Sequence, residues 1–87
     1  MTNIEIYTQP GCPYCADAIT LLRRKRAPFH EISAPHGSPE RAHAIARSGR
    51  ATVPQIFIAN QPIGGCDDLY ALDAAGKLDA LIVGASP

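Results

Sequence analysis

The sequence predicts an α/β fold: a four-stranded mixed sheet flanked by three or more helices, in the order β-α-β-α-β-β-α. Two segments with strand character, 3–8 and 28–33, flank an amphipathic segment at 13–25. Such a β-α-β unit predicts two parallel strands joined by a right-handed crossover. Two later strand segments, 55–59 and 63–64, are joined by an Asn-Gln-Pro turn, which predicts a hairpin and therefore an antiparallel edge. Helices are expected on both faces of this sheet.

The first strand and helix are predicted from two different apolar periods. Ile4 and Ile6 alternate with polar residues, which is typical of a strand. A Gln-Pro-Gly break follows, and Pro13 suits the first turn of a helix, where its missing N–H needs no partner. The apolar residues of the helix recur at i, i+3, i+4 and i+7, so they form one buried face. These residues are Cys15, Ala18, Ile19 and Leu22.

A second helix is predicted after a loop at 34–37. Residues 38–40, Ser-Pro-Glu, combine a hydroxyl cap, a proline at the first position and an acid in the first turn. We expect this helix to run to Ser48 and to end at Gly49, because glycine readily adopts the left-handed conformation of a C-cap. The residues expected on its buried face are Ala42, Ile45 and Ala46.

The rest of the chain is expected to supply the centre of the sheet and the last helices. Residues 56–58, Ile-Phe-Ile, form an almost continuous apolar run, which favours a central strand. A third helix is expected to begin at Cys66 or Asp67 and to end at Gly76. One last helical turn is predicted from Leu78, Leu81 and Ile82.

Length and composition limit the classes of function. The 87 residues are expected to form a single domain, 1–87. Eight basic and eight acidic side chains balance, which argues against a nucleic-acid or membrane-surface partner. No apolar run is long enough to span a membrane, and the first residues lack the pattern of a secretory signal. We therefore expect a cytoplasmic protein, in a reducing compartment where a close cysteine pair is more often catalytic or metal-binding than structural.

The Cys-x-x-Cys pair formed by Cys12 and Cys15 is open to a metal-binding or a redox interpretation. A structural zinc site needs four ligands, usually two such pairs or one pair with two closely spaced histidines. Here Cys66 stands alone, and the three histidines fall on three different predicted elements. No metal site is therefore expected.

A redox role is favoured by the places where the two cysteines fall. Cys12 is at the start of the predicted helix, where unpaired N–H groups and the positive end of the helix dipole favour a thiolate. Cys15 lies one turn later, on the face expected to be buried. Cys12 is therefore predicted to be the exposed nucleophile and Cys15 the shielded resolving thiol. A pair with this spacing beside a β-α-β unit is typical of a thioredoxin-like site.

Pro54 stands at the start of the predicted central strand. Proline is tolerated at the first residue of such a strand, so this position is compatible with an ordinary strand start. The alternative is a cis Val53–Pro54 peptide bond, which would present the Val53 backbone as a docking edge for an extended peptide or thiol.

The stretch IGGCDDL, residues 63–69, also has two interpretations. It is compatible with a turn followed by an ordinary acidic helix start. Alternatively, the glycines allow a ligand to approach the backbone, and the free N–H groups of the helix start hold its carboxylate. Cys66 within this stretch is more simply a packing thiol than a third redox centre.

Together these motifs resemble the glutaredoxin family. The matching segments are 12–15 (CPYC), 52–54 (TVP) and 64–68 (GGCDD), in the family's order and at its separations, and the resemblance covers the chain from residue 4 to about 81. RSGRATVPQIFI and IGGCDDLYALDAAGKLDAL are especially similar to small bacterial dithiol glutaredoxins. The resemblance implies a thioredoxin fold, glutathione as co-substrate and no permanently bound cofactor.

The resemblance also implies a glutathione site. The cysteinyl unit of glutathione would pair with the Val53 backbone, and its γ-glutamyl end would lie against the Cys66 backbone and Asp67. Arg41 would bind the glycine carboxylate, whose geometry suits a guanidinium fork. One departure is Gln9, because many glutaredoxins carry lysine three residues before the nucleophile. The residues implied in the site are Tyr14, Arg41, Thr52, Val53, Pro54, Gly65, Cys66 and Asp67.

The activity implied is glutathione-dependent reduction of protein disulfides and glutathione mixed disulfides by a monomer, with ribonucleotide reductase among the family's substrates. A [2Fe–2S] carrier is one alternative, with Cys12 of two chains and two glutathiones as ligands, although Pro13 and Cys15 are unusual in such members. A second alternative is a redoxin reduced by a thioredoxin reductase. Arg41 and residues 64–67 argue against this alternative. An inert fold with a structural cysteine pair is the third.

Overall fold

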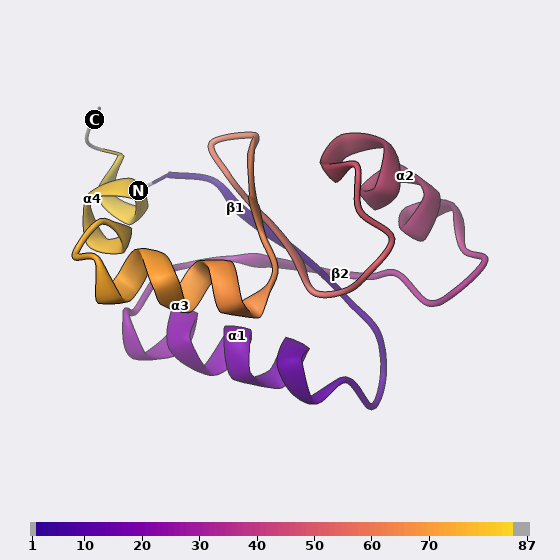
Figure 1. The fold of residues 1–87 in the computed structure, drawn as a ribbon, viewed down its shortest axis with the longest axis horizontal. Helices are drawn as coiled ribbons and strands as arrows, with labels where there is room; N and C mark the ends of the chain where they lie inside the picture. Colours follow the sequence, from indigo (N-terminus) through magenta and orange to yellow (C-terminus); the bar gives the residue numbers. More distant parts are fainter. Residues whose placement is uncertain (1, 85–87) are drawn as a thin grey trace.

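The computed structural model describes residues 2–84, which form the sheet and helices of Figure 1. The predicted order β-α-β-α-β-β-α is confirmed, and the last helical turn is a separate short helix. No helix among these residues is long and apolar enough to cross a membrane. The elements are β1 (Ile4–Thr8), α1 (Pro13–Arg24), β2 (His30–Ser33), α2 (Pro39–Ser48), β3 (Gln55–Ile58), β4 (Gln61–Gly64), α3 (Cys66–Ala74) and α4 (Leu78–Val83).

The strands lie in the order β2-β1-β3-β4, so β1 and β3 occupy the centre of the sheet. β1 pairs parallel with β2 and antiparallel with β3, and β3 pairs antiparallel with β4. The sheet is therefore mixed, as predicted. Every residue of β3 is buried, which agrees with the central strand expected from its apolar run.

The hairpin between β3 and β4 differs from the prediction in its turn. Gln61 and Pro62 belong to β4, and Ala59 and Asn60 form the turn. Both turn residues have positive φ, 51° and 66°. Positive φ at both positions gives a two-residue turn whose twist matches that of the two strands it joins. Pro62 is tolerated because β4 is an edge strand, where a missing N–H donor need not interrupt a ladder.

Two apolar clusters fill the two sides of the sheet. Side chains alternate along β3, so that Ile56 and Ile58 join the larger cluster and Phe57 joins the smaller one with Tyr7. The larger cluster includes residues of α1, α3 and α4, and the smaller one includes Ala44 of α2. Figure 1 shows α1 and α3 side by side, with α2 on the other side of the sheet. Helices therefore cover both faces, as predicted.

The buried face of α1 is close to the predicted one. Cys15, Ala18 and Leu22 are buried, as expected. Leu21 is buried as well, whereas Ile19 is only partly buried at the edge of the core.

The predicted buried face of α2 is wrong. Ala42, Ile45 and Ala46 are exposed. The buried residues of this helix are Arg41 and Ala44, one position earlier than expected. An apolar period cannot identify such a face, because one of its members is an arginine whose burial depends on satisfied hydrogen bonds.

Arg47 completes the contact between α2 and the sheet. Its guanidinium carbon lies 3.9 Å from the centre of the Phe57 ring, a distance at which the ring attracts a cation. Its Nη1 donates to the Tyr7 hydroxyl at 2.9 Å, and its Nη2 pairs with Glu5 at 3.0 Å. Arg47 therefore helps to hold α2 against the sheet, and Ile45 lies exposed on the outer side.

Candidate active site

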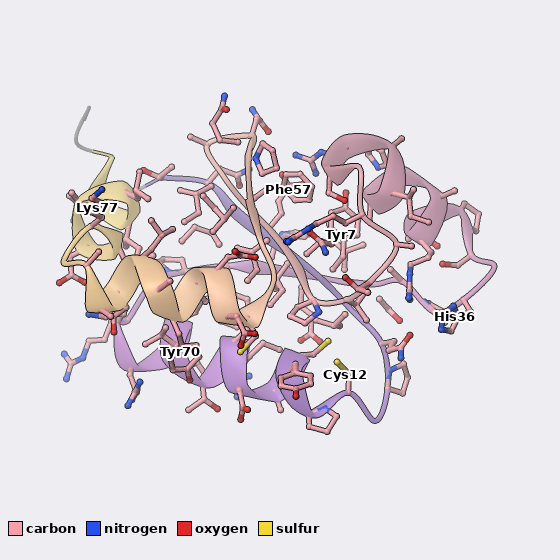
Figure 2. The ribbon with its side chains drawn as sticks, in the orientation of Figure 1. Tyr7, Cys12, His36, Phe57, Tyr70 and Lys77 are labelled. Atoms are coloured by element: carbon pink, nitrogen blue, oxygen red, sulfur yellow. The ribbon has the colours of Figure 1, made fainter. Side chains whose placement is uncertain are left out.

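Cys12 is the N-cap of α1. Its backbone is extended, with φ −98° and ψ 106°, and Pro13 occupies the first helical position. The Cys12 Sγ accepts a hydrogen bond from the Cys15 N–H at 3.2 Å, so it satisfies one of the unpaired donors of the first turn. Figure 2 shows Cys12 at the start of α1, toward the end of the molecule opposite Lys77. The sulfur therefore lies where helix N–H dipoles favour negative charge.

The other two cysteines are buried thiols. Cys15 is 3% exposed, and burial, followed by the hydrogen bond with Cys12, raises the pKa of its thiol. Cys66 is 8% exposed, and burial, followed by the charge of Asp17, raises the pKa of its thiol. All three cysteines are free, and Cys12 is the one that is partly exposed. Within residues 2–84, no group of three or more His, Cys, Asp or Glu side chains is placed to hold a metal ion.

The loop before β3 carries a cis Val53–Pro54 peptide bond, which is the second of the two interpretations of Pro54. The Cys12 Sγ lies 3.9 Å from the Val53 carbonyl oxygen, which is within reach of a weak S–H···O hydrogen bond. Thr52 is fixed from the strand side, because Gln55 Nε2 donates to its carbonyl oxygen at 3.0 Å. The accessible cysteine and this loop are therefore neighbours, although 41 positions separate Cys12 from Val53 in the sequence.

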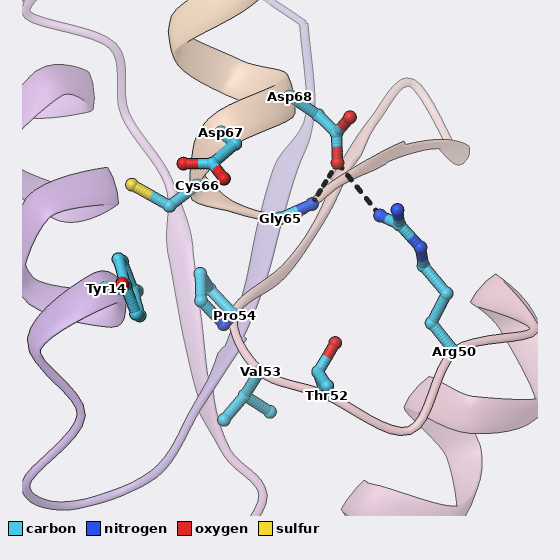
Figure 3. A pocket seen from close by; sticks show the side chains of 9 residues that line it. All are labelled: Tyr14, Arg50, Thr52, Val53, Pro54, Gly65, Cys66, Asp67 and Asp68. Atoms are coloured by element: carbon cyan, nitrogen blue, oxygen red, sulfur yellow. Dashed lines mark hydrogen bonds and ion pairs between the residues drawn. The ribbon is translucent and has the colours of Figure 1, made fainter.

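An open groove of about 310 Å³ runs from this loop to the start of α3. In Figure 3 the Tyr14 ring stands at one end, the Arg50 side chain at the other, and Pro54 between them. Seven of the eight residues predicted for glutathione binding line the groove, and Arg41 does not. The lining residues are Tyr14, Arg50, Thr52, Val53, Pro54, Gly65, Cys66, Asp67 and Asp68.

Arg50 and Asp68 line the groove although the sequence did not single them out. Arg50 Nη1 pairs with Asp68 Oδ2 at 2.8 Å, and the same oxygen accepts a hydrogen bond from the Gly65 N–H at 2.9 Å. The Arg50 contact, followed by the Gly65 hydrogen bond, lowers the pKa of the Asp68 carboxyl. Asp68 is the third residue of α3, where an acid often reaches back to the N-cap N–H, so its position was a usable signal. No comparable sequence pattern marks Arg50.

Arg41 is 6% exposed and makes a different set of contacts from those expected. Its Nε and Nη2 donate to the Ala51 carbonyl oxygen at 3.2 and 3.0 Å, and its Nη1 donates to Ala34 O at 2.8 Å and Gln9 Oε1 at 2.9 Å. These bonds use four of the five N–H groups of a guanidinium. Arg41 thus joins the loop before Cys12 to the loop that carries the cis bond. Its contact with a glutathione carboxylate stays a prediction.

Gln9 stands where the resemblance leads one to expect lysine, and the structure gives a reason for the exchange. Its side-chain oxygen is one of the acceptors that satisfy the buried Arg41. A lysine here could not accept this hydrogen bond, because its ammonium group has only donors. Gln9 and the buried Arg41 are therefore compatible as a pair.

The fold agrees with comparisons to known proteins. The glutaredoxin family model matches residues 4–63 of this chain. The chain belongs to the glutaredoxin family. Glutaredoxin 3 of Escherichia coli (strain K12) is 56% identical to it over 82 residues, which cover 94% of this chain and 99% of that protein. Glutaredoxins are thiol–disulfide oxidoreductases, and this chain is one of them.

Solved glutaredoxin structures have the same architecture. The solution structure of glutaredoxin from Brucella melitensis matches with a TM-score of 0.81 at 59% identity, covering 94% of this chain and 89% of that one. The crystal structure of a buckwheat glutaredoxin–glutathione complex matches with a TM-score of 0.85 at 26% identity, covering 94% and 77%. The thioredoxin fold expected from the sequence is therefore confirmed.

Proposed function

We propose that this glutaredoxin reduces protein disulfides and glutathione mixed disulfides, with glutathione as electron donor and Cys12 and Cys15 as its redox pair. The observation that supports this most is the 3.9 Å contact between Cys12 Sγ and the Val53 carbonyl oxygen, because it brings the accessible sulfur to the groove. A groove of about 310 Å³ is within the range that small ligands occupy. The similar buckwheat protein was solved as a complex with glutathione.

The first proposed reaction reduces a protein disulfide and uses both cysteines. The Cys12 thiolate attacks one sulfur of the substrate, forms a mixed disulfide and releases the other sulfur as a thiolate that takes up a proton. Cys15 then loses its proton and attacks the Cys12 sulfur, which releases the reduced protein and closes a Cys12–Cys15 disulfide. Two glutathione molecules reopen this disulfide through a Cys12–glutathione intermediate and leave as glutathione disulfide. Each step is thiol–disulfide exchange, so no other oxidant or reductant is needed.

The second proposed reaction removes glutathione from a glutathionylated protein and needs only Cys12. The Cys12 thiolate attacks the glutathionyl sulfur, and the protein leaves as a free thiol. A second glutathione attacks the Cys12–glutathione disulfide, which regenerates the thiolate and yields glutathione disulfide. Selectivity in both reactions depends on how well the groove holds the glutathionyl group beside Cys12.

The proposed glutathione-binding site extends from Tyr14 to the start of α3. The cysteinyl backbone pairs with Val53, beside the accessible sulfur. The N–H groups of Cys66 and Asp67, the first residues of α3, face the γ-glutamyl carboxylate, because a helix start favours anions. The Asp67 carboxylate accepts from the glutamyl ammonium. Thr52, Pro54 and Gly65 complete the groove.

The alternatives have less support than this proposal. A cluster carrier would use Cys12 alone, whereas here a second cysteine lies one turn behind it. If a thioredoxin reductase were the only electron donor, the groove would have no small-molecule ligand. A single domain, a monomeric state, a cytoplasmic location and substrates such as ribonucleotide reductase are further expectations of the proposal.

A coupled assay tests the electron donor. The purified protein is given the mixed disulfide of glutathione and a small thiol, either with glutathione and glutathione reductase or with a thioredoxin reductase. We expect turnover with glutathione, little with thioredoxin reductase, and none in Cys12→Ser. Equal or greater turnover with thioredoxin reductase would contradict the proposal.

A further inference from the structure

The end of the groove nearest α3 carries an ion pair that the proposed reactions do not use. Arg50 Nη1 and Asp68 Oδ2 are 2.8 Å apart, and their side chains are 51% and 46% exposed. Both residues line the groove, and Figure 3 shows the guanidinium reaching toward Gly65 from the loop after α2. Because the Arg50 side chain is half exposed, its guanidinium is accessible to a ligand in the groove.

We propose that Arg50 binds the γ-glutamyl α-carboxylate of glutathione and that Asp68 holds the guanidinium in position for it. The inference rests on the proposed function, because it names the residue that recognises one end of the proposed substrate. It makes Arg50, together with the N–H groups at the start of α3, the determinant of selectivity for γ-glutamyl thiols.

At this end of the groove, a ligand carboxylate needs a nearby cation to offset the acidic side chains. Asp67 and Asp68 are adjacent acids in the first turn of α3, and a carboxylate that approached them without a counter-charge would be repelled. The γ-glutamyl group carries one ammonium and one carboxylate. Arg50 balances Asp68, so Asp67 remains for the ammonium while the guanidinium and helix N–H groups receive the carboxylate.

The geometry leaves Arg50 donors for a ligand. Among the described residues its guanidinium donates one hydrogen bond, from Nη1 to Asp68 Oδ2. Asp68 itself is held from a second side by the Gly65 N–H at 2.9 Å, so the pair is anchored to the backbone of α3. Four N–H groups of the guanidinium are left over, enough for the bidentate contact that carboxylates prefer.

Gly64 provides the space that this pair occupies. A Cβ at this position would overlap the Asp68 carboxylate and come within 2.8 Å of Arg50 Nη1. The residue also has φ +112°, a conformation that side chains disfavour. The backbone beside the groove is therefore shaped to let Arg50 and Asp68 meet.

Arg41, which the family resemblance assigns to the glycine carboxylate at the other end of glutathione, has fewer unpaired N–H donors than Arg50. It is 6% exposed, and four of its five N–H groups already bond to protein oxygens. A bidentate carboxylate contact would require it to give up at least one of them. Of the two arginines near the loop before β3, Arg50 is thus the one with free donors on the groove.

Three mixed disulfides of the same peptide test the proposal: with glutathione, with γ-glutamylcysteine and with cysteinylglycine. The measured quantity is kcat/KM for each disulfide, in the wild type, in Arg50→Gln and in Arg24→Gln. Arg24 is an exposed residue in the last turn of α1, so its replacement changes net charge equally at the other end of that helix. We expect Arg50→Gln to lower kcat/KM about five- to tenfold for the two γ-glutamyl substrates and less than twofold for cysteinylglycine. Arg24→Gln should change none of them.

Two results would overturn the inference. One is an unchanged kcat/KM for the γ-glutamyl substrates in Arg50→Gln, and the other is an equal loss for all three substrates. Both outcomes presuppose that the wild type uses glutathione. If the wild type itself showed no glutathione-dependent turnover, the proposed function would fail instead, so the two failures are distinguishable.

Discussion

The Cys15 N–H donates a hydrogen bond to the Cys12 sulfur across 3.2 Å, so the backbone of one cysteine holds the sulfur of the other. Cys15 itself is a buried residue, 3% exposed. The two thiols are therefore close along the chain but differ in access, and a substrate disulfide meets Cys12 first. This difference leads to separate predictions for the two cysteines.

Replacing each cysteine with serine should separate the two proposed reactions. Cys15→Ser should keep most of the removal of glutathione from a glutathionylated peptide, because only Cys12 exchanges in that reaction. It should lose most of the reduction of a protein disulfide, because nothing then resolves the mixed disulfide. Cys12→Ser should lose both. Loss of deglutathionylation in Cys15→Ser would show that the roles are assigned wrongly.

The raised pKa of the Cys15 thiol predicts how the stability of the reduced protein depends on pH. The pKa in the folded state is above that of an unfolded cysteine, about 8.5, so the unfolded chain gives up this proton first. The stabilisation is complete below that pH and is lost as pH rises toward the folded pKa. The free energy of unfolding in urea, measured at pH 7 and pH 10, should fall less in Cys15→Ala than in the wild type. An equal fall would contradict the shift.

Arg41→Gln should destabilise the fold more than an exposed arginine replacement does. The change removes hydrogen bonds to Ala51, Ala34 and Gln9, of which the bond to the Ala34 carbonyl oxygen is buried. We expect a loss of about 2–4 kcal/mol in the free energy of unfolding, against less than ~0.5 kcal/mol for Arg24→Gln. Similar values for the two variants, from urea denaturation, would contradict the structural role of Arg41.

Gly64→Ala should disturb the groove beyond the effect of backbone strain. Gly37 is the matched control, because it also has positive φ, +82°, but a Cβ there would meet nothing within 4 Å. Each replacement should cost about 1–2 kcal/mol of stability from strain alone. Only Gly64→Ala should also lower kcat/KM for a glutathionyl substrate, since its Cβ displaces Asp68 and Arg50. Equal kinetics in the two variants would show that the clash is relieved without moving the pair.

Much of the fold could be predicted because its signals are local. The alternating Ile4 and Ile6, the proline at position 13 and the glycine that ends α2 each act within a few residues. The cis Val53–Pro54 bond was predictable only as one of two interpretations, because a proline at a strand start does not by itself define its isomer.

The contacts that the sequence did not reveal join distant residues through polar atoms. The α2 face was misassigned because Arg41 is buried through carbonyl oxygens of two separate loops, which no apolar period records. Arg50 was missed for the same reason: its partner, Asp68, lies 18 positions away and meets it only in the folded chain. Asp68 alone carried a local signal, as the third residue of a helix.

The central claim is that Cys12 takes the glutathionyl group from a substrate, and the most direct test is to trap that intermediate. Cys15→Ser is mixed with one equivalent of a glutathionylated peptide, without free glutathione, and the intact protein and its proteolytic fragments are weighed by mass spectrometry. We predict one glutathionyl group per chain, attached to Cys12, together with release of the reduced peptide. No adduct, or a glutathionyl group on Cys66 in place of Cys12, would contradict the claim.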